Sequence, residues 1–331
     1  MLSLPFLSSV VSSSPFMCKG NGWSNRFFPI HESRTELRSP SSASVLGRRS
    51  FSRARKVKVG NLGSEAARSE GEEENFQVLT AIRSKYNDIV IVDSPKSRML
   101  LLDSTHNVHS IVQKGDEKWT GSYWDEFASL PAIIPEGPIA IYGLGGGTAA
   151  YLMLDVWPSL QLEGWEIDGI LIDKAREYLG LSELEKHTEA GGRLQVHIGD
   201  VFPAGQNPSE GYAGIVIDLF SDGEVLAELQ EVATWLELKD RLMPKGRFMV
   251  NCGGISEASK TIDGNEIQNS TIRAMAAAFP GQLYWKVLGE REGQNYLALT
   301  GPFPDIDLWS AVLPEHLSKT VKQWRPYEPI P

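Results

Sequence analysis

The stretch PIAIYGLGGGTAAYLMLDVW, which begins at Pro138, constrains the fold of this chain more than any other part of the sequence. The short apolar run IAIY is followed by four glycines within five residues, and then by apolar residues at helical spacing. Glycines let a backbone turn tightly and approach a ligand, and a helix that begins there presents unpaired N–H groups. The stretch therefore predicts a strand, a turn and a helix, with a ligand bound at the turn.

Strand-like and helix-like patterns alternate from Pro138 onward. We expect helices between five strands, which are IAIYGL, LQLEGWEI, RLQVHIG, GIVIDLF and RFMVNCGG, and a closing antiparallel hairpin made of LYWKVLGE and NYLALTG. This alternation is typical of an α/β protein whose mainly parallel sheet is covered by helices on both faces. Upstream, the runs DIVIVDS, RMLLLDS and VHSIVQ predict a small antiparallel sheet of about three strands.

The first 60 residues differ in composition from the rest of the chain. They hold ten Lys and Arg residues against only Glu32 and Glu36, and they are rich in serine, which is typical of an organelle transit peptide. We expect a chloroplast address, with the mitochondrion as the alternative. Residues 61–75 are polar and acidic and predict a disordered linker. A small β domain is expected over residues 76–120 and a ligand-binding domain over residues 121–331.

The composition argues against several classes of protein. No apolar run approaches the roughly 18 residues of a membrane-spanning helix. Beyond the leader the chain is strongly acidic, which disfavours a nucleic acid partner and is compatible with a cationic small-molecule substrate. Cys252 is the one cysteine beyond the leader, and the six histidines show no metal-ligand spacing, so we expect no disulfide and no metal. The sequence leaves a homodimer open.

Three acidic residues follow successive predicted strands. Glu166 can accept hydrogen bonds from both hydroxyls of a ribose, Asp200 can accept from an adenine amino group, and Asp218 ends the fourth strand. Each alone could be a helix N-cap. Because the carboxyl ends of parallel strands meet at one edge, we expect the three acids to surround one crevice. An NAD-dependent oxidoreductase is disfavoured, because its glycine fingerprint would need glycine where this chain has Thr148.

Four segments resemble the cofactor-binding and catalytic segments of the spermidine synthase family, namely YGLGGGTAA, EGWEIDGILIDKAREYLG, LQVHIGDVF and GYAGIVIDLFSD. YNDIVIVDS and RMLLLD are similar to its N-terminal β-hairpin, and SYWDEFASLP is similar to its Tyr-containing substrate segment. The similarity spans about Tyr86 to Thr300. It implies a Rossmann-like class I methyltransferase fold, with a mainly parallel seven-stranded sheet and a terminal antiparallel hairpin, preceded by a small antiparallel β domain.

The same resemblance implies roles for individual residues. The family binds S-adenosylmethionine (AdoMet) or its decarboxylated form. The catalytic aspartate is Asp218. The cofactor site comprises Gly143, Gly145, Gly146, Gly147, Glu166, Asp168, Asp200 and Val201, and the glycines surround the amino-acid end of the ligand. Tyr123, Asp125 and Asp222 would orient a small cationic amine.

The chain also departs from the family pattern. The family's glycine loop carries an aspartate directly after three consecutive glycines, where it holds the ammonium of decarboxylated AdoMet, and this chain has Thr148 there. The usual Tyr-Gln-Glu reads Tyr-Trp-Asp from Tyr123, the histidine before Leu-Pro is Ser129, and the segment from Asp218 to Asp222 is one residue longer. Because a lost carboxylate removes repulsion of the AdoMet carboxylate, we expect AdoMet to bind at least as well as the decarboxylated form.

These departures leave two reactions and one alternative open. Methyl transfer needs little beyond alignment, whereas aminopropyl transfer needs a carboxylate that accepts the proton of an amine. We expect an AdoMet-dependent transferase in which methyl transfer is slightly favoured over aminopropyl transfer to a polyamine. The alternative is a non-catalytic ligand-binding or assembly protein that retains the fold.

Overall fold

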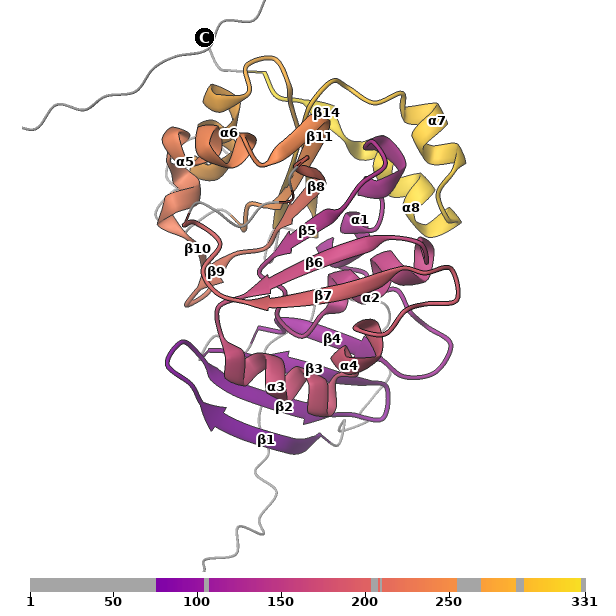
Figure 1. Ribbon diagram of the computed structural model, residues 1–331, viewed down its shortest axis with the longest axis vertical. Helices are drawn as coiled ribbons and strands as arrows, with labels where there is room; N and C mark the ends of the chain where they lie inside the picture. Colours follow the sequence, from indigo (N-terminus) through magenta and orange to yellow (C-terminus); the bar gives the residue numbers. More distant parts are fainter. Residues whose placement is uncertain are drawn as a thin grey trace, which may run out of the picture. The chain divides into compact units, whose positions relative to one another are not determined.

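The computed structural model describes residues 76–103, 107–203, 208, 210–254, 269–289 and 295–328 (Figure 1). All of them belong to one compact unit, Ala54–Pro331. The predicted transit peptide and linker lie outside the described residues, so both stay predictions. Two sheets carry the fold, a small antiparallel one and a larger mixed one.

The small sheet has four antiparallel strands in the order β1 (Gln77–Arg83), β2 (Asp88–Asp93), β3 (Ser97–Leu101) and β4 (Ser110–Gln113). The last three correspond to the predicted runs, and β1 is the additional strand. It lies at the sheet edge and most of its residues are exposed, so it lacks the alternation of apolar and polar residues that marks a half-buried strand. Its pairing with β2 contains an irregularity between Val78 and Thr80.

The large sheet has eight strands in the order β14-β12-β13-β11-β8-β5-β6-β7. The parallel part comprises β5 (Ile139–Tyr142), β6 (Gln161–Glu166), β7 (Arg193–Ile198), β8 (Tyr212–Ile217) and β11 (Leu242–Asn251). The hairpin of β12 (Leu283–Leu288) and β13 (Asn295–Thr300) pairs antiparallel with β11 through β13. The predicted α/β class, parallel sheet and closing hairpin are confirmed, and the short β14 (Arg325–Pro326) adds an eighth strand.

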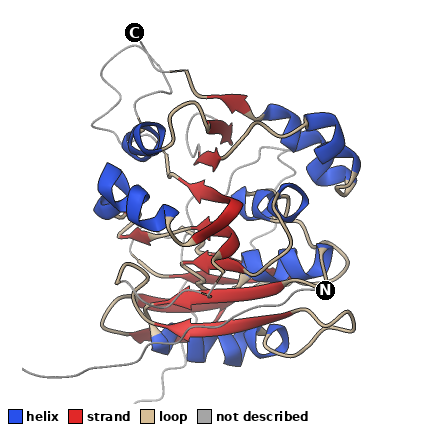
Figure 2. Cartoon of the chain, turned by 45° about the horizontal axis from the view of Figure 1, so that its top comes forward, coloured by secondary structure: helices blue, strands red, loops and turns tan. Residues whose placement is uncertain are grey.

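Helices cover both faces of the large sheet (Figure 2). One face packs against α1 (Tyr123–Phe127), α2 (Thr148–Val156), α3 (Gly169–Tyr178), α4 (Leu181–Leu184), α7 (Ile306–Ala311) and α8 (Glu315–Thr320), together with the 3-10 turns η1 (Leu130–Ile133) and η5 (Val321–Gln323). The other face packs against α5 (Val232–Lys239), α6 (Ser270–Ala278) and the turn η2 (Ala227–Gln230). None of the helices in the described ranges is long and apolar enough to cross a bilayer.

The prediction of a helix between every pair of strands is not met by the described residues of one connection. The described residues between β7 and β8 contain turns but no helix. The small hairpin of β9 (Phe220–Ser221) and β10 (Glu224–Val225) instead follows β8. Its turn contains Asp222 in a left-handed conformation, with φ at 51°.

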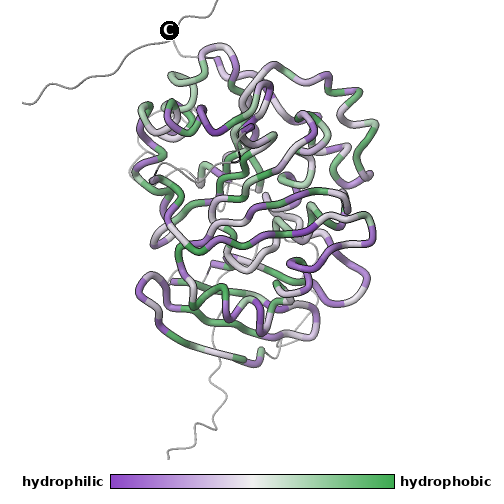
Figure 3. The backbone as a smooth tube through the Cα atoms, in the orientation of Figure 1, coloured by the Kyte–Doolittle hydropathy of each residue, from purple (hydrophilic) through white to green (hydrophobic). Residues whose placement is uncertain are grey.

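The small sheet shares its core with the large one. Its apolar residues Ile89, Ile91 and Leu100 are fully buried in the same cluster as residues of α2 and α3, and the apolar stretches appear green in Figure 3. Arg98 of β3 also donates to the carbonyl of Tyr178 at the end of α3, at 2.9 Å. The small sheet is therefore part of the wall around the carboxyl edge of the large sheet.

Candidate functional site

The glycine loop joins β5 to α2 at the carboxyl edge of the sheet, as predicted from its sequence. Gly143 has a φ of 84°, and a Cβ placed on it would lie 2.1 Å from the carbonyl oxygen of Asp218. Gly147, with a φ of 92°, is the N-cap of α2. Glycine is required at Gly143 on two grounds, because the backbone conformation is left-handed and the neighbouring strand leaves no room for a side chain.

The amides of this loop are already hydrogen-bonded within the protein. The amides of Gly143 and Leu144 both donate to the carbonyl of Trp165 at 3.0 Å, and that of Gly147 donates to the carbonyl of Leu144 at 3.0 Å. The amide of Gly145 donates to Oε2 of Glu166 at 3.0 Å, and that of Gly146 donates to Oγ of Ser110 at 2.7 Å. The prediction that these glycines surround the amino-acid end of a ligand stays a prediction, and their amides would not supply hydrogen bonds to it. None of the five amides from Gly143 to Gly147 is left unpaired for a ligand carboxylate.

Thr148 faces strand β4 and not the crevice. Its hydroxyl accepts from the amide of Ile111 at 2.8 Å and donates to the carbonyl of the same residue at 3.0 Å. Only 3% of Thr148 is exposed. The side chain links α2 to the small sheet, and any effect of residue 148 on ligand selectivity stays a prediction.

Glu166 ends β6 with its carboxylate held by two backbone amides. Oε2 accepts from Gly145 at 3.0 Å and Oε1 accepts from Asp168 at 3.1 Å. Burial is the largest influence on Glu166 and raises its pKa, against the lowering effect of those two hydrogen bonds. A carboxylate can accept about four hydrogen bonds, so each oxygen retains capacity for one ribose hydroxyl.

Asp168 has a structural role that the sequence did not reveal. Oδ1 caps α3 by accepting from the amides of Ile170 at 3.1 Å and Leu171 at 3.3 Å. Oδ2 accepts from Ser84 Oγ at 2.5 Å and Asn87 Nδ2 at 2.8 Å. With only 1% of the residue exposed and four donors on its carboxylate, Asp168 ties the β1–β2 turn to α3. It supports the site and does not offer a free carboxylate to a cofactor.

Asp200 and Val201 lie in the loop after β7. Asp200 is exposed, and its Oδ1 accepts from the amide of Phe202 at 3.0 Å. Val201 is buried, and the guanidinium of Arg241 donates to its carbonyl and to that of Phe202. Arg241 therefore holds Val201 and Phe202 in place, while Asp200 stays exposed.

Two exposed isoleucines in the same region were missed at the sequence level. Ile167 follows Glu166 and is 39% exposed, and Ile198 ends β7 and is 56% exposed. The position of a Cβ on Gly169 would be 3.5 Å from the Ile198 side chain, so this residue lies against the start of α3. Large apolar side chains left exposed at the carboxyl edge of a sheet are candidates for contact with a flat apolar ligand surface.

The centre of the site is a cluster around Asp218. Asn251, at the end of β11, donates from Nδ2 to Oδ1 of Asp218 at 3.0 Å, and the side chains of Tyr123 and Trp124 lie beside this carboxylate and lower its pKa. Burial is the largest influence and raises the pKa of Asp218 to about 6, with a smaller raising effect from the charge of Glu166. Burial and the Asp218 charge raise the pKa of Tyr123 well above its ordinary value, so this phenol stays protonated.

Two of the cluster's members were not among the predicted site residues. Asn251 follows Val250 in β11 as Asp218 follows Ile217 at the end of β8, and Val250 and Ile217 are paired. That position was a signal from which Asn251 could have been predicted as a site residue. Trp124 gave no signal that distinguished a hydrogen bond from packing. The structure brings the predicted pair Tyr123 and Asp218 together, although they are far apart in the sequence.

Asp125 does not join this cluster. Its Oδ1 accepts from the amide and hydroxyl of Thr120 at 2.9 and 2.7 Å, and Oδ2 accepts from the amide of Gly121 at 2.9 Å and lies 2.9 Å from Nε2 of His316. Asp125 is only 2% exposed. Its prediction as a substrate-binding residue is corrected, because the carboxylate anchors the start of α1.

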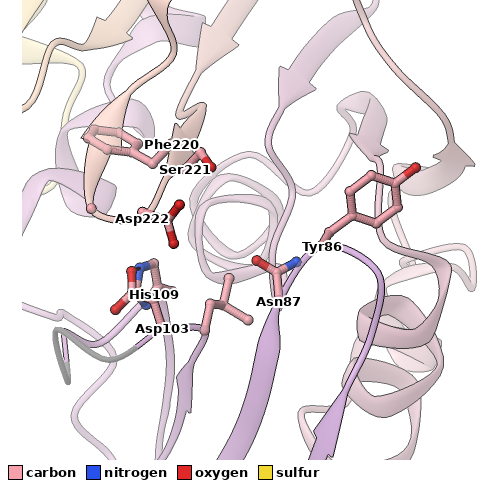
Figure 4. Close-up of a pocket in the computed structure, with 9 residues that line it drawn as sticks. Tyr86, Asn87, Asp103, His109, Phe220, Ser221 and Asp222 are labelled. Carbon is pink, nitrogen blue, oxygen red and sulfur yellow. Dashed lines mark ion pairs between the residues drawn. The ribbon is translucent and has the colours of Figure 1, made fainter.

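Asp222 lines a small cavity between the β9–β10 turn and the small sheet (Figure 4). Asp103 and His109 face it from the end of β3 and the start of β4, with their side chains 3.3 Å apart. Tyr86 and Asn87 line the other side. Two carboxylates and no Lys or Arg are found among the described residues that line it, so the cavity favours cations over anions.

No protein-family model matches the chain. The chain is 25% identical over 193 residues to a probable polyamine aminopropyl transferase of Bifidobacterium longum strain NCC 2705. The match covers 58% of this chain and spans 41% of the length of that relative.

Among solved structures, a probable spermidine synthase from Corynebacterium glutamicum superposes with a TM-score of 0.51 at 16% identity, over 71% of this chain and 86% of the other. Spermidine synthase from Thermotoga maritima gives a TM-score of 0.48 at 17% identity, over 74% and 87%. The resemblance to spermidine synthases is confirmed, and the fold is of the predicted Rossmann-like class.

Proposed function

We infer that this chain, which has a spermidine synthase-like fold, is a transferase that uses decarboxylated AdoMet and moves its aminopropyl group to a small amine. The relative from Bifidobacterium longum carries the name of this activity. The cluster of Asp218, Tyr123 and Asn251 supplies the base that such a transfer requires. This differs from the slight preference for methyl transfer that the sequence suggested. That preference rested on the departures from the family pattern, and Thr148, which is one of them, faces β4 and not the crevice.

The occupied amides of the glycine loop are the observation that carries the proposal. AdoMet differs from its decarboxylated form by one carboxylate, which needs hydrogen-bond donors or a cation when it leaves water. All five amides from Gly143 to Gly147 donate to protein acceptors. The neighbouring carboxylates of Glu166 and Asp218 repel a further negative charge and attract an ammonium group. The crevice thus favours the ligand without the carboxylate.

The nucleoside part of the ligand fits the residues at the ends of β6 and β7. Glu166 retains acceptor capacity for the ribose hydroxyls, and Asp200 has one carboxylate oxygen to which no described residue donates. Ile167 and Ile198 present exposed apolar surface for a face of the adenine. When bound, this sulfonium nucleoside supplies a carbon whose bond to sulfur breaks as the bond to the amine nitrogen forms, leaving a neutral thioether.

The role of the chain's own residues is to hold the amine and accept its proton. A primary ammonium has a pKa of about 10 in water and cannot attack until it loses a proton. Asp218, with a pKa near 6, is ionised at neutral pH and more basic than an ordinary aspartate. Tyr123 and Asn251 fix its orientation. The proton passes from the amine nitrogen to the Asp218 carboxylate and then to solvent.

Ligand preference provides a test that does not depend on the acceptor. In calorimetric titrations of the full chain at pH 7.5, decarboxylated AdoMet is expected to bind about tenfold or more tightly than AdoMet, which corresponds to about 1.4 kcal/mol. Ser110→Ala should narrow this gap, because it leaves the amide of Gly146 free for a carboxylate.

The matched control is Ser270→Ala, whose hydroxyl bonds to Gln230 on the opposite face of the large sheet. This variant should leave both affinities unchanged. If AdoMet binds as tightly as the decarboxylated form to the unmodified chain, the selectivity argument fails and methyl transfer regains its place as the leading function.

A further inference from the structure

We propose that the C-terminal segment from Ile306 to Trp324, the C-terminal clamp, positions Tyr123 against Asp218 by holding helix α1. The clamp comprises α7, α8 and η5 and ends at the residue before β14. This proposal deepens the proposed function, and what it implies for catalysis rests on that function. It makes residues of the clamp positioning residues for the base and not catalytic residues.

Helix α1 cannot hold its own position. It has five residues, and the side chain of its N-cap, Ser122, makes no capping hydrogen bond. A helix this short is not stable in isolation, so tertiary contacts must fix it. Four of its five residues are buried, from Trp124 to Phe127. The orientation of Tyr123 is therefore set by what packs around the helix.

The first anchor is a buried ion pair. Oε1 of Glu126 lies 2.8 Å from Nζ of Lys286 on β12, and the two side chains are 3% and 1% exposed. Lys286 also donates to the carbonyl of Thr320 at 2.9 Å and lies over the ring of Trp324 at 5.6 Å. One ammonium thus joins α1 to both ends of the η5 turn. A buried ion pair of this kind fixes the positions of its two side chains more dependably than it stabilises the fold.

The second anchor holds the start of α1. Nε2 of His316 on α8 lies 2.9 Å from Oδ2 of Asp125, and its ring stacks on Trp119 with centroids 4.5 Å apart. Beyond the other end of α1, Nε1 of Trp309 on α7 donates to the carbonyl of Ser129 at 2.9 Å. The clamp therefore contacts the chain just before α1, within α1 and just after it.

The clamp reaches Asp218 through the side chains of α1. The groups that face the Asp218 carboxylate are Tyr123 and Trp124 from α1, Asn251 from β11 and the charge of Glu166 from β6. The two from α1 depend on the clamp, and they also contribute to the burial of the carboxylate. Loosening α1 would let water reach Asp218 and would break its bond to Tyr123.

Hydration of the Asp218 carboxylate and loss of the Tyr123 donor shift its pKa in opposite directions, which makes the proposal testable. Burial is the larger influence on Asp218, so hydration of the site should lower the pKa of its carboxyl. Removing only the phenol hydroxyl, in Tyr123→Phe, leaves the carboxylate buried with one donor fewer and should raise that pKa. Substitution of a residue with a merely structural role would shift the pKa of Asp218 in neither direction.

The experiment is a pH titration of the full chain, followed by NMR of 13C-labelled aspartate carboxyls, with Asp218→Asn used to assign the signal. Lys286→Met and His316→Ala should each lower the Asp218 midpoint by about half a pH unit or more. In either background, adding Tyr123→Phe should produce a smaller upward shift than in the unmodified chain. His316→Gln retains a donor for Asp125 and should titrate closer to the unmodified chain.

The control is Arg176→Gln, which breaks a half-buried pair with Glu185 beside α3 and should not move the midpoint. If Lys286→Met does not fold, His316→Ala decides, since its side chain is 36% exposed and tolerates truncation better. Folded clamp variants that titrate like the unmodified chain would overturn the proposal. Because the titration needs no turnover, an inactive protein would refute the proposed function and leave this inference standing.

Discussion

Asp218→Asn is expected to abolish transfer and, at the same time, to make the protein more stable at pH 8. Asparagine keeps an oxygen that accepts from Asn251 and Tyr123, so the site should stay intact. It cannot accept a proton from the amine, and loss of a positioned base typically lowers a rate by about 10²- to 10⁴-fold. Ligand affinity, measured by calorimetry, should change little.

The stability effect follows from the sign of the pKa shift. Burial raises the pKa of Asp218 from 3.8 to about 6, so the folded state holds this proton more tightly than the unfolded state. The resulting stabilisation is complete below pH 4 and is lost as the pH rises through 6. The charged carboxylate then opposes folding by up to about 3 kcal/mol, which Asp218→Asn removes.

Urea denaturation at pH 4 and pH 8 measures this difference directly. The variant should gain stability over the unmodified chain only at the higher pH. Asp240→Asn, at the exposed C-terminal end of α5, is the control and should alter neither rate nor stability. An Asp218→Asn variant that turns over normally, or that loses stability at pH 8, would contradict the assignment of Asp218 as a base with a raised pKa.

Gly143→Ala is expected to cause the largest loss of stability among single substitutions in the glycine loop. The new Cβ would lie 2.1 Å from the carbonyl oxygen of Asp218, which is backbone and cannot rotate away, and φ is 84°. Left-handed strain alone costs about 1 to 2 kcal/mol, and a backbone clash adds to it, so a total above about 3 kcal/mol is expected. Thermal denaturation should show a large fall in midpoint or no folded protein.

Gly180→Ala separates the clash from the strain. Gly180 has a φ of 75°, and a Cβ placed there would meet no heavy atom within 4 Å. This variant should lose only the strain contribution of about 1 to 2 kcal/mol. Equal losses in the two variants would mean that the loop does not pack against Asp218 as closely as described.

The mainly parallel large sheet and its closing hairpin could be predicted, because strand patterns that alternate with helix patterns indicate parallel strands joined by helices. Strand β1 could not, because most of its residues are exposed and carry no periodic signal. The described residues between β7 and β8 form no helix, and the sequence did not show this for a similar reason. A connection is inferred from the strands on either side and not from residues of its own.

The predicted site residues fall into two groups for a physical reason. Glu166, Asp200 and Asp218 end strands, and the parallel sheet alone brings strand ends together. Asp168, Asp125 and Thr148 have short polar side chains beside free backbone groups, and such side chains often bond to the backbone locally or across a domain contact. The sequence does not show which of these occurs.

The partner of the glycine loop also lay beyond sequence reasoning. Ser110 accepts from Gly146 across 36 residues, and nothing in the run VHSIVQ marks it. That contact occupies the amide of Gly146, and the proposed preference for decarboxylated AdoMet depends on it. If the proposal holds, ligand selectivity depends on how the small sheet packs on the large one.

The most direct test of the account is the product formed by the full chain. The protein would be incubated with decarboxylated AdoMet or AdoMet, each with and without putrescine or spermidine, and the mixtures analysed by mass spectrometry. Release of the thioether together with an aminopropylated amine, from decarboxylated AdoMet only and lost in Asp218→Asn, is the predicted result. A methylated acceptor made from AdoMet, or ligand binding with no product from any pair, would contradict it.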